Sequence, residues 1–400
     1  MNVLFITWDG PQVSYLEGLF LPIFKALESA DIYVHILQFT WGDQEKIESS
    51  RIACQNAGCG YESISVIRSP VALGSLLSAT IGYRHIRRVI KQQKIDVVMP
   101  RSILPALSSL LALRGRKERL VFEADGLPID ERVEFSGLSN TSFIYRFLRD
   151  IEAQVVRRAD YVLTRSLKAS EILIARAGSG VDPDKFINFN NGRDSDVFSV
   201  KSDSYSKRVK NELGIPKDSE LVIYVGSIGG KYLLYEMLKL FSYIKDFNKD
   251  THFLILTGDV ENVEKEISLM QIATGSITVM TVNSDKVSYY VAAADLGLSL
   301  IKPSYSMQAV SVLKIGEYLL SGVPVISTAG IGNSSETCLE AGFVISSIND
   351  INLKQAAKWF VDEVIPNKSK YREFSRSAGL MYYSNDLTIE AYKKAILGDF

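Results

Sequence analysis

The amino-acid sequence predicts an α/β protein with two domains, each built on a parallel sheet that helices cover on both faces. Short apolar segments rich in Val, Ile, Leu and Phe alternate with longer segments of helical periodicity from the first residues onward. The alternation pauses in a polar stretch at residues 188–206 and then begins a second time. Strands that alternate with helices are typical of parallel sheets with crossover helices, and 400 residues suffice for two domains with a core each.

The first series of elements begins at the N-terminus. Its strand segments are short and nearly all apolar, as expected for strands that are buried on both faces. The segments between them repeat apolar residues at intervals of three and four, as amphipathic helices do. The predicted strands are residues 3–7, 32–39, 97–99, 120–123 and 161–164, and the predicted helices are residues 13–30, 44–57, 105–115 and 166–177.

The second series follows the polar stretch, which is rich in Asn, Asp, Ser and Gly and indicates a linker. Its predicted strands are residues 221–225, 253–257, 277–280, 296–300 and 323–327, with a helix at 233–247 and helical segments between the other strands. Residues 370–397 also have a helical pattern. We therefore expect an N-terminal domain over residues 1–195, a second domain over 196–370 and a C-terminal helix within 371–400.

Charge and cysteine content restrict the class of protein. The 45 basic and 46 acidic side chains give a formal net charge of -1, so no whole-molecule field favours a nucleic-acid partner. Three cysteines cannot all pair, and no basic N-terminal segment precedes a long apolar core, so we expect a reducing, cytoplasmic location. No run of apolar residues is long enough to predict a helix that spans a membrane.

Candidate metal ligands are scattered along the chain. His35, His85 and His252 are far apart in strand-like or helical sequence, which argues against a metal cluster. The two Asp-x-Asp matches, at residues 182–184 and 194–196, lie in turn-like sequence, where caps and turns explain them better. Neither G-x-S-x-G nor H-E-x-x-H occurs, which excludes two common hydrolase motifs. We expect no metal and no other cofactor.

The most informative stretch is SVLKIGEYLLSGVPVIST, residues 311–328. Lys314 and Glu317 stand one helical turn apart at the start of a predicted helix, which Gly322 and Pro324 end before an apolar strand. Free N–H groups at a helix start attract phosphate, a carboxylate accepts hydrogen bonds from ribose hydroxyls, and lysine adds a positive charge. The stretch therefore suggests a nucleoside diphosphate site, although a surface ion pair one turn apart is the ordinary alternative.

A second candidate is the glycine-rich turn GSIGGK at residues 226–231, between a predicted strand and a predicted helix. Glycines let backbone N–H groups approach an anion without obstruction by a β-carbon. The turn matches neither the Walker pattern nor the G-x-G-x-x-G dinucleotide pattern. A tight connection without a ligand is the alternative.

Residues 311–326 resemble the signature Ser-Pro-x-Lys-x-x-Glu-Tyr-Leu-Ala-x-Gly-x-Pro-Val-Ile of retaining glycosyltransferases with the GT-B fold. The matching residues are Ser311, Lys314, Glu317, Tyr318, Leu319, Gly322, Pro324, Val325 and Ile326. The resemblance implies two doubly wound domains facing a cleft, a C-terminal helix that returns to the N-terminal domain, and transfer with retention from a nucleotide sugar. The chain departs from relatives with two glutamates, because Ala309 stands at the earlier position, and Val312 replaces the branch's proline.

The resemblance also assigns roles to residues of the second half. It implies that donor binding uses Gly226, Ser227, Gly229, Lys231, Ser311, Lys314 and Glu317. Lys231 and Lys314 are the catalytic candidates there, because departure of the diphosphate generates negative charge that ammonium groups stabilise without a metal. Glu317 is expected to hold the ribose.

The acceptor side is expected in the first half, where residues 122–132 hold four carboxylates within nine positions. This loop resembles the family's acceptor segment, and Asp125 and Glu131 are its candidates for orienting or activating the acceptor hydroxyl. Solvated charges at a helix start are the alternative. The loop after the first strand, with Asp9 and Gly10, is expected to line the acceptor site, with a structural turn as its alternative.

Two segments combine apolar and basic residues, at 69–94 and 143–158. This combination suits an anionic membrane face, and its alternative is two helices that face the core with solvated outer sides. On the first interpretation the protein contacts the inner leaflet peripherally and its acceptor is attached to a lipid.

The sequence thus predicts a cytoplasmic glycosyltransferase that moves a hexose-type sugar to a hydroxyl of a glycan or lipid-linked saccharide, as in surface polysaccharide biosynthesis. A GT-B sugar-nucleotide epimerase or hydrolase is one alternative. A noncatalytic partner with the same shape is another, supported by Ala309 at the place of a glutamate. A nicotinamide oxidoreductase is disfavoured by the missing glycine fingerprint.

Overall fold

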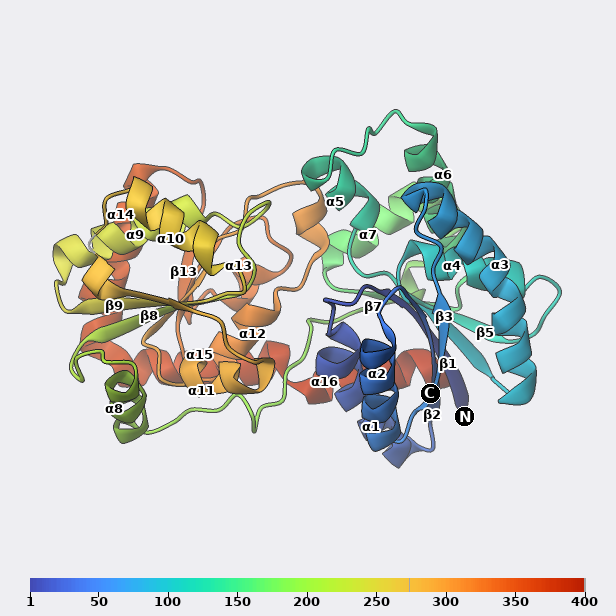
Figure 1. Ribbon diagram of the computed structural model, residues 1–400, viewed down its shortest axis with the longest axis horizontal. Coiled ribbons are helices and arrows are strands. Elements are labelled where there is room, and N and C mark those ends of the chain that lie inside the picture. Colours follow the sequence, from blue (N-terminus) through green and yellow to red (C-terminus); the bar gives the residue numbers. More distant parts are fainter. Residues whose placement is uncertain (273, 399–400) are drawn as a thin grey trace. The chain divides into compact units, whose positions relative to one another are not determined.

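A computed structural model of the chain describes residues 1–272 and 274–398 (Figure 1). The chain forms two compact units, of which the first contains Met1–Phe189 together with Asp386–Phe400 and the second contains Asn190–Asn385. These bounds differ at their edges from the expected ranges 1–195, 196–370 and 371–400. The chain therefore leaves the first unit once and comes back to complete it.

The first unit is built on a parallel sheet of seven strands in the order β3-β2-β1-β4-β5-β6-β7. The register of β1 and β2 runs from Asn2 opposite Tyr33 to Asp9 opposite Thr40. The strands are β1 Asn2–Asp9, β2 Tyr33–Thr40, β3 Gly60–Ser65, β4 Val97–Pro100, β5 Arg119–Glu123, β6 Tyr161–Thr164 and β7 Phe186–Asn188.

Helices cover both faces of this sheet (Figure 1). Helix α16 lies with α1 on one face, and α3, α4 and α6 pack together on the other. The helices are α1 Leu21–Leu27, α2 Gln44–Asn56, α3 Val71–Gln92, α4 Ile103–Ala112, α5 Pro128–Phe135, α6 Phe143–Arg158, α7 Leu167–Ala177 and α16 Asn385–Leu397.

The second unit has a parallel sheet of six strands in the order β10-β9-β8-β11-β12-β13. Its strands are β8 Glu220–Val225, β9 Thr251–Leu256, β10 Ile277–Met280, β11 Leu296–Ser299, β12 Val325–Thr328 and β13 Gly342–Ile345. Helices α9 and α14 pack on one face, and α12 and α15 pack on the other. The helices are α8 Asp203–Glu212, α9 Leu234–Phe247, α10 Val260–Leu269, α11 Val287–Val291, α12 Leu313–Leu320, α13 Ser334–Thr337, α14 Asp350–Trp359 and α15 Lys368–Tyr383.

The C-terminal helix α16 belongs to the first unit because its buried side chains complete that unit's core. The Tyr392 ring lies edge-on to the rings of Phe24 and Phe189, with centroids 6.2 and 5.6 Å apart. Its hydroxyl donates a 2.8 Å hydrogen bond to Glu123 Oε2 at the end of β5. The predicted return of a helical tail to the N-terminal domain is therefore seen, although only for α16.

Several predicted boundaries differ from those of the structure. The expected helix over 13–30 begins later, as a π-helical turn at Leu16–Phe20 followed by α1. The expected tail helix is two helices, which the extended residue Ser384 separates, and α15 packs on α12 in the second unit. Strands β3, β7 and β13 were not predicted. None of the residues of β3 and β7 is fully buried, and in β13 only Ile345 is.

Candidate functional site

The second unit contains a buried ammonium group at the start of α12. The Lys314 residue is 8% exposed, and its Nζ has no hydrogen-bond partner among the residues that the structure describes. Nζ lies 4.1 Å from the ring centroid of Tyr224 and 4.5 Å from that of Tyr232. The negative faces of these two rings partly replace the water that the cation has lost.

The glycine-rich turn after β8 lies directly beside this ammonium group. Gly226 has a φ of +137°, and a β-carbon built on it would stand 3.0 Å from Lys314 Nζ. Lys231, at the end of the turn, adds a second positive charge that acts on Lys314. The segments 226–231 and 311–317, which are far apart in sequence, therefore lie side by side.

The protonation of Lys314 is unusual for a lysine. Burial lowers the pKa of its ammonium group to about 7, Glu317 acts to raise it, and the charge of Lys231 lowers it further. A lysine in this state gains a proton readily when an anion arrives. The turn and the helix start together therefore place two positive charges beside glycine backbone.

Glu317 does not pair with Lys314, as a simple surface ion pair would require. Its Oε1 accepts from Arg193 Nη2 at 2.8 Å instead. Two residues before Arg193, the Asn191 N–H donates to Ser311 Oγ at 2.8 Å, and the Asn191 side-chain amide donates to the Ser311 carbonyl at 2.9 Å. The segment expected to be a linker thus fastens onto the start of α12.

Close packing fixes α12 in place. The Tyr318 hydroxyl accepts from the Val225 N–H at 2.9 Å, directly before the glycine turn, and Gly297 leaves room for the Tyr318 ring. On the other side of α12, Gly316 faces the ring of Tyr383 on α15, where a β-carbon would come within 2.8 Å. Small residues at both contacts let α12 approach β11 and α15 closely.

The site lies where the strand order of the second sheet reverses. Strands β8 and β11 are neighbours, and the connections that leave their carboxyl ends run in opposite directions, toward β9 and β12. Ligands of open parallel sheets bind at this position, outside the carboxyl ends of the strands. Gly226 follows β8 and Ile301 follows β11, and the Leu233 N–H bonds to the Leu300 carbonyl at 3.2 Å to hold the two loops together.

Of the remaining donor-side residues, Ser227 is exposed, and its carbonyl accepts a 2.6 Å bond from the Tyr224 hydroxyl. Gly229 has a φ of +86° and is exposed, with no heavy atom within 4 Å of a β-carbon built on it. All seven predicted donor-side residues thus lie in the turn after β8 or at the start of α12. Their roles in binding stay a prediction.

The predicted acceptor residues of the first unit surround a buried arginine. The Arg101 guanidinium lies 2.7 Å from Asp125 Oδ1 and 3.7 Å from Asp9 Oδ1. Asp9 is 4% exposed, and its Oδ2 also accepts from the hydroxyl of Thr7 at 2.6 Å and the amide of Gln38 at 3.3 Å. Asp9 therefore orients Arg101, whereas Asp125, which has a φ of +54°, keeps an accessible side.

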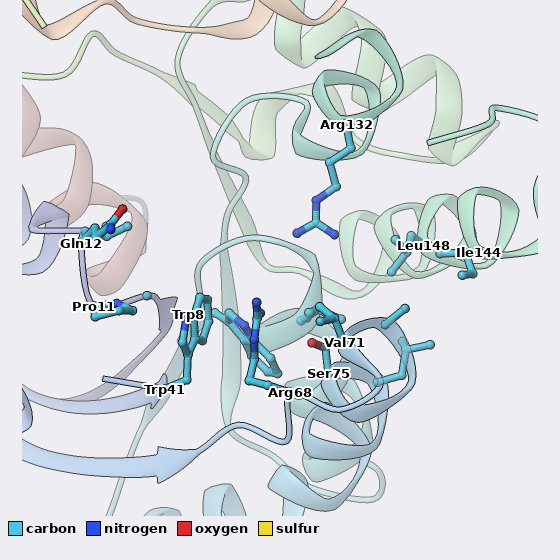
Figure 2. Close-up of a pocket in the computed structure, with 15 residues that line it drawn as sticks. Trp8, Pro11, Gln12, Trp41, Arg68, Val71, Ser75, Arg132, Ile144 and Leu148 are labelled. Carbon is cyan, nitrogen blue, oxygen red and sulfur yellow. The ribbon is translucent and has the colours of Figure 1, made fainter. Parts of the chain in front are cut away.

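Two cavities lie beside this cluster in the first unit. The larger has a volume of about 730 Å³, and its walls come from the loop after β1, from Trp41 and Arg68, and from α3, α4, α5 and α6 (Figure 2). Trp8, Gly10, Pro11, Gln12, Val13, Trp41, Arg68, Val71, Ala72, Ser75, Leu76, Leu104, Arg132, Ile144 and Leu148 line it. The smaller, of about 200 Å³, has Arg101, Asp125 and Arg132 among its lining residues.

Only two of the four predicted acceptor residues line one of these cavities. Gly10 lines the larger cavity and Asp125 the smaller one. Asp9 and Glu131 are not among the described residues that line either cavity. Glu131 lies in the first turn of α5, and its neighbour Arg132 lines both cavities.

Sequence reasoning missed several residues of both sites. Arg193 was placed in a linker, and Arg68 and Trp41 belong to no motif. Arg132 is the last residue of the predicted acceptor segment 122–132, but it was given no role there. The signal available for Arg193 was the run Asn190 to Arg193, in which polar residues able to bond a helix start follow directly after a strand. No comparable local signal marks Arg68, because the cavity that it lines is formed by loops and four separate helices.

The two basic, apolar segments form α3 and α6. Both bury a core face, but α3 leaves Val71, Leu73, Leu77 and Ile81 exposed, and Phe143 at the start of α6 is 79% exposed. Within the described ranges, no helix has the length and apolar content needed to cross a membrane. The same residues contain no group of His, Cys, Asp and Glu side chains that could hold a metal ion.

Comparison with solved structures identifies the fold. The chain matches a glycosyltransferase from Rickettsia africae (TM-score 0.73, 17% identity, 100% of both chains covered) and HepE from Anabaena in complex with UDP-glucose (0.69, 14%, 100% of both). It also matches WaaG, a glycosyltransferase involved in lipopolysaccharide biosynthesis (0.69, 16%, 99% of both). The predicted fold class, two doubly wound units of the GT-B type, is therefore confirmed.

No protein-family model matches the chain, and no curated protein matches its sequence.

Proposed function

We propose that the chain is a glycosyltransferase that moves a sugar from a nucleoside diphosphate sugar to an acceptor hydroxyl. The observation that carries this proposal is the buried, unpartnered ammonium group of Lys314 beside the glycine turn at Gly226. A cation without a partner, at the carboxyl edge of a parallel sheet, suits a pyrophosphate ligand. The similarity in fold to HepE, whose structure holds UDP-glucose, supports the same class of donor.

In this proposal the charge that develops on the leaving diphosphate is stabilised by Lys314, Lys231 and the N–H groups of the glycine turn. These donors are in place before the reaction, so little reorganisation is needed as the bond to the sugar breaks. Glu317 accepts hydrogen bonds from the ribose hydroxyls, and Arg193 holds its carboxylate in position. The reaction needs no metal, and the resemblance to the retaining branch supports retention at the sugar carbon.

The acceptor binds to the first unit in this proposal. Asp125 is the candidate that orients or deprotonates the hydroxyl, because it lines a cavity and Arg101 fixes one of its oxygens. Glu131 remains the second candidate. The acceptor is a glycan or lipid-linked saccharide of a surface polysaccharide, which the similarity in fold to WaaG supports.

We further propose that the protein works in the cytoplasm, in peripheral contact with the membrane. The exposed apolar residues of α3 and α6, together with exposed basic residues such as Arg84 and Arg88 on α3, support this location. Sedimentation with anionic vesicles tests it, because Leu73→Ser with Leu77→Ser should reduce the bound fraction.

The decisive experiment is a thermal-shift screen against nucleoside diphosphates, followed by product analysis. A ligand that prefers the folded protein raises its melting temperature, so at least one diphosphate should do so. Sugar transfer that requires an added acceptor supports the proposal. Conversion of the donor without an acceptor would identify an epimerase or hydrolase, and binding without turnover would identify a noncatalytic partner.

A further inference from the structure

The larger cavity of the first unit has an unbalanced charge. Arg68 and Arg132 are among its lining residues, and none of its described lining residues is an aspartate or glutamate. Within the described chain, neither guanidinium group has a carboxylate within 4 Å. This contrasts with Arg101 in the smaller cavity, which Asp125 and Asp9 neutralise. Two like charges that face one cavity repel each other unless an anion enters.

One wall of this cavity is aromatic. The Arg68 guanidinium carbon lies 4.2 Å from the centroid of the Trp41 ring, and the Trp8 ring stacks on Phe39 with centroids 4.9 Å apart. Gly10 lets the chain pass against Trp41, since a β-carbon there would come within 2.7 Å of Cζ2. Arg68 lies beside these rings, and Arg132 extends from α5 into the cavity (Figure 2).

The opposite wall is apolar and continues to the protein surface. Val71 and Leu76 of α3, with Ile144 and Leu148 of α6, line the cavity. Val71 and Ile144 are also among the exposed large apolar residues, so the wall runs from inside the cavity to the solvent. A volume of about 730 Å³ is within the usual range for small-molecule sites.

We infer that this cavity binds an amphipathic acceptor in which a phosphate group joins a saccharide to an apolar chain. Arg68 and Arg132 bind the phosphate, Trp41 and Trp8 contact the saccharide, and the wall from α3 and α6 contacts the chain. Guanidinium groups suit a phosphate because their N–H groups match its oxygens in pairs. The role of the bound molecule as acceptor rests on the proposed function, whereas its binding does not.

The test is a titration followed by tryptophan fluorescence. The chain has three tryptophans, of which Trp8 and Trp41 line the cavity, so Trp359→Phe leaves reporters only there. The probes are n-octyl phosphate, neutral n-octyl glucoside and inorganic phosphate, each below its micelle concentration where one exists. Octyl phosphate should bind at least about 10-fold more tightly than the other two, and salt should weaken its binding.

Substitutions locate the binding site. Arg68→Gln and Arg132→Gln should each weaken octyl phosphate binding about 10-fold and leave octyl glucoside binding unchanged. Arg84→Gln is the matched control, because Arg84 is exposed on α3 but does not line the cavity. Melting curves confirm that the variants fold. If the Trp359→Phe variant does not fold, calorimetry on the protein with Trp359 intact replaces the fluorescence titration.

Equal affinities for octyl phosphate and octyl glucoside, or equal losses in the Arg84 control, would overturn the inference. If inorganic phosphate binds as tightly as octyl phosphate, the inference that the wall from α3 and α6 contacts an apolar chain is overturned. The titration contains no nucleotide, so a failure of diphosphate binding in the second unit would refute the proposed function and leave this result standing.

Discussion

The ammonium group of Lys314 lies against Gly226 so closely that a β-carbon on the glycine would stand 3.0 Å from Nζ. The contact joins a helix start to a turn that precedes it by almost ninety residues. It keeps the cation next to exposed backbone, where a phosphate can contact both. We expect the proposed function to depend on this contact.

Gly226→Ala should weaken the binding of a nucleoside diphosphate by about 10-fold or more, because the β-carbon displaces Nζ and the φ of +137° disfavours alanine. The free energy of unfolding should fall by about 1–3 kcal/mol. Calorimetry and urea denaturation measure the two effects. Gly178→Ala is the control, since it has a φ of +90° but no atom near its β-carbon. Equal losses of affinity in both variants would contradict the prediction.

Lys314→Met should lower the turnover number by about 100-fold, because the leaving diphosphate loses a preformed positive charge. The same change should raise the free energy of unfolding of the unliganded protein at pH 6 by about 1–3 kcal/mol, since it removes a buried charge without a partner. Steady-state kinetics and denaturation test both parts. Lys358→Met, at an exposed position of α14, should change neither. Unaltered turnover in the Lys314 variant would argue against its role.

Glu317→Gln should weaken donor binding about 10-fold, because the ribose loses a charged acceptor, and should lower stability, because the ion pair with Arg193 is lost. The double variant with Arg193→Gln should recover part of the stability but none of the affinity. A double-mutant cycle, measured once for donor affinity and once for the free energy of unfolding, separates the role of Glu317 in binding from its role in the ion pair. If affinity recovers together with stability, Glu317 acts only through the ion pair.

The pH dependence of binding should report Lys314. Burial lowers its pKa to about 7, below that of an unfolded lysine, so between pH 7 and 10 the unfolded chain holds more of this proton. The contribution of Lys314 to stability therefore rises with pH in that window. A bound diphosphate favours the charged form, so binding at pH 8 should take up about 0.9 proton. Calorimetry in buffers of different ionisation enthalpy measures this uptake, which Lys314→Met should abolish.

Tyr392→Phe should lower the free energy of unfolding of the first unit by about 1–3 kcal/mol, because Glu123 Oε2 loses its hydroxyl donor in a fully buried place. Urea denaturation followed by a probe in that unit measures the change. Tyr33→Phe, at a half-exposed tyrosine of the same unit, serves as the control. A loss below 0.5 kcal/mol, on the order of an exposed substitution, would show that the bond contributes little.

Sequence patterns anticipated the parts of the fold that short-range chemistry decides. The apolar strands at the centre of both sheets, such as β1 and β8, were predicted because burial on both faces demands uniformly apolar residues. Lys314 and Glu317 were recognised because they stand one turn apart at the start of a helix whose end Gly322 marks. The edge strand β3 was missed, since only part of it is buried and its residues alternate weakly.

Partners across the chain could not be predicted in the same way. Arg193 meets Glu317 because Asn191, two residues earlier, is hydrogen-bonded to Ser311 before α12, and no local pattern encodes this contact. The cavity between Trp41 and Arg132 arises from separate helices that the sheet order brings together. Asp9 was grouped with the acceptor residues. Only the packed structure reveals that its carboxylate accepts hydrogen bonds from Thr7 and Gln38 and forms an ion pair with Arg101.

The path of the chain has a consequence for biosynthesis. A ribosome completes residues 1–189, then all of the second unit, and only afterwards α16. Until Tyr392 emerges, Phe24 and Phe189 lack the ring that packs against them, and Glu123 Oε2 lacks its hydroxyl donor. The core of the first unit is therefore completed only after the second unit has been synthesised, and a nonsense mutation near residue 386 removes part of the core of the first unit although it leaves residues 1–189 unchanged.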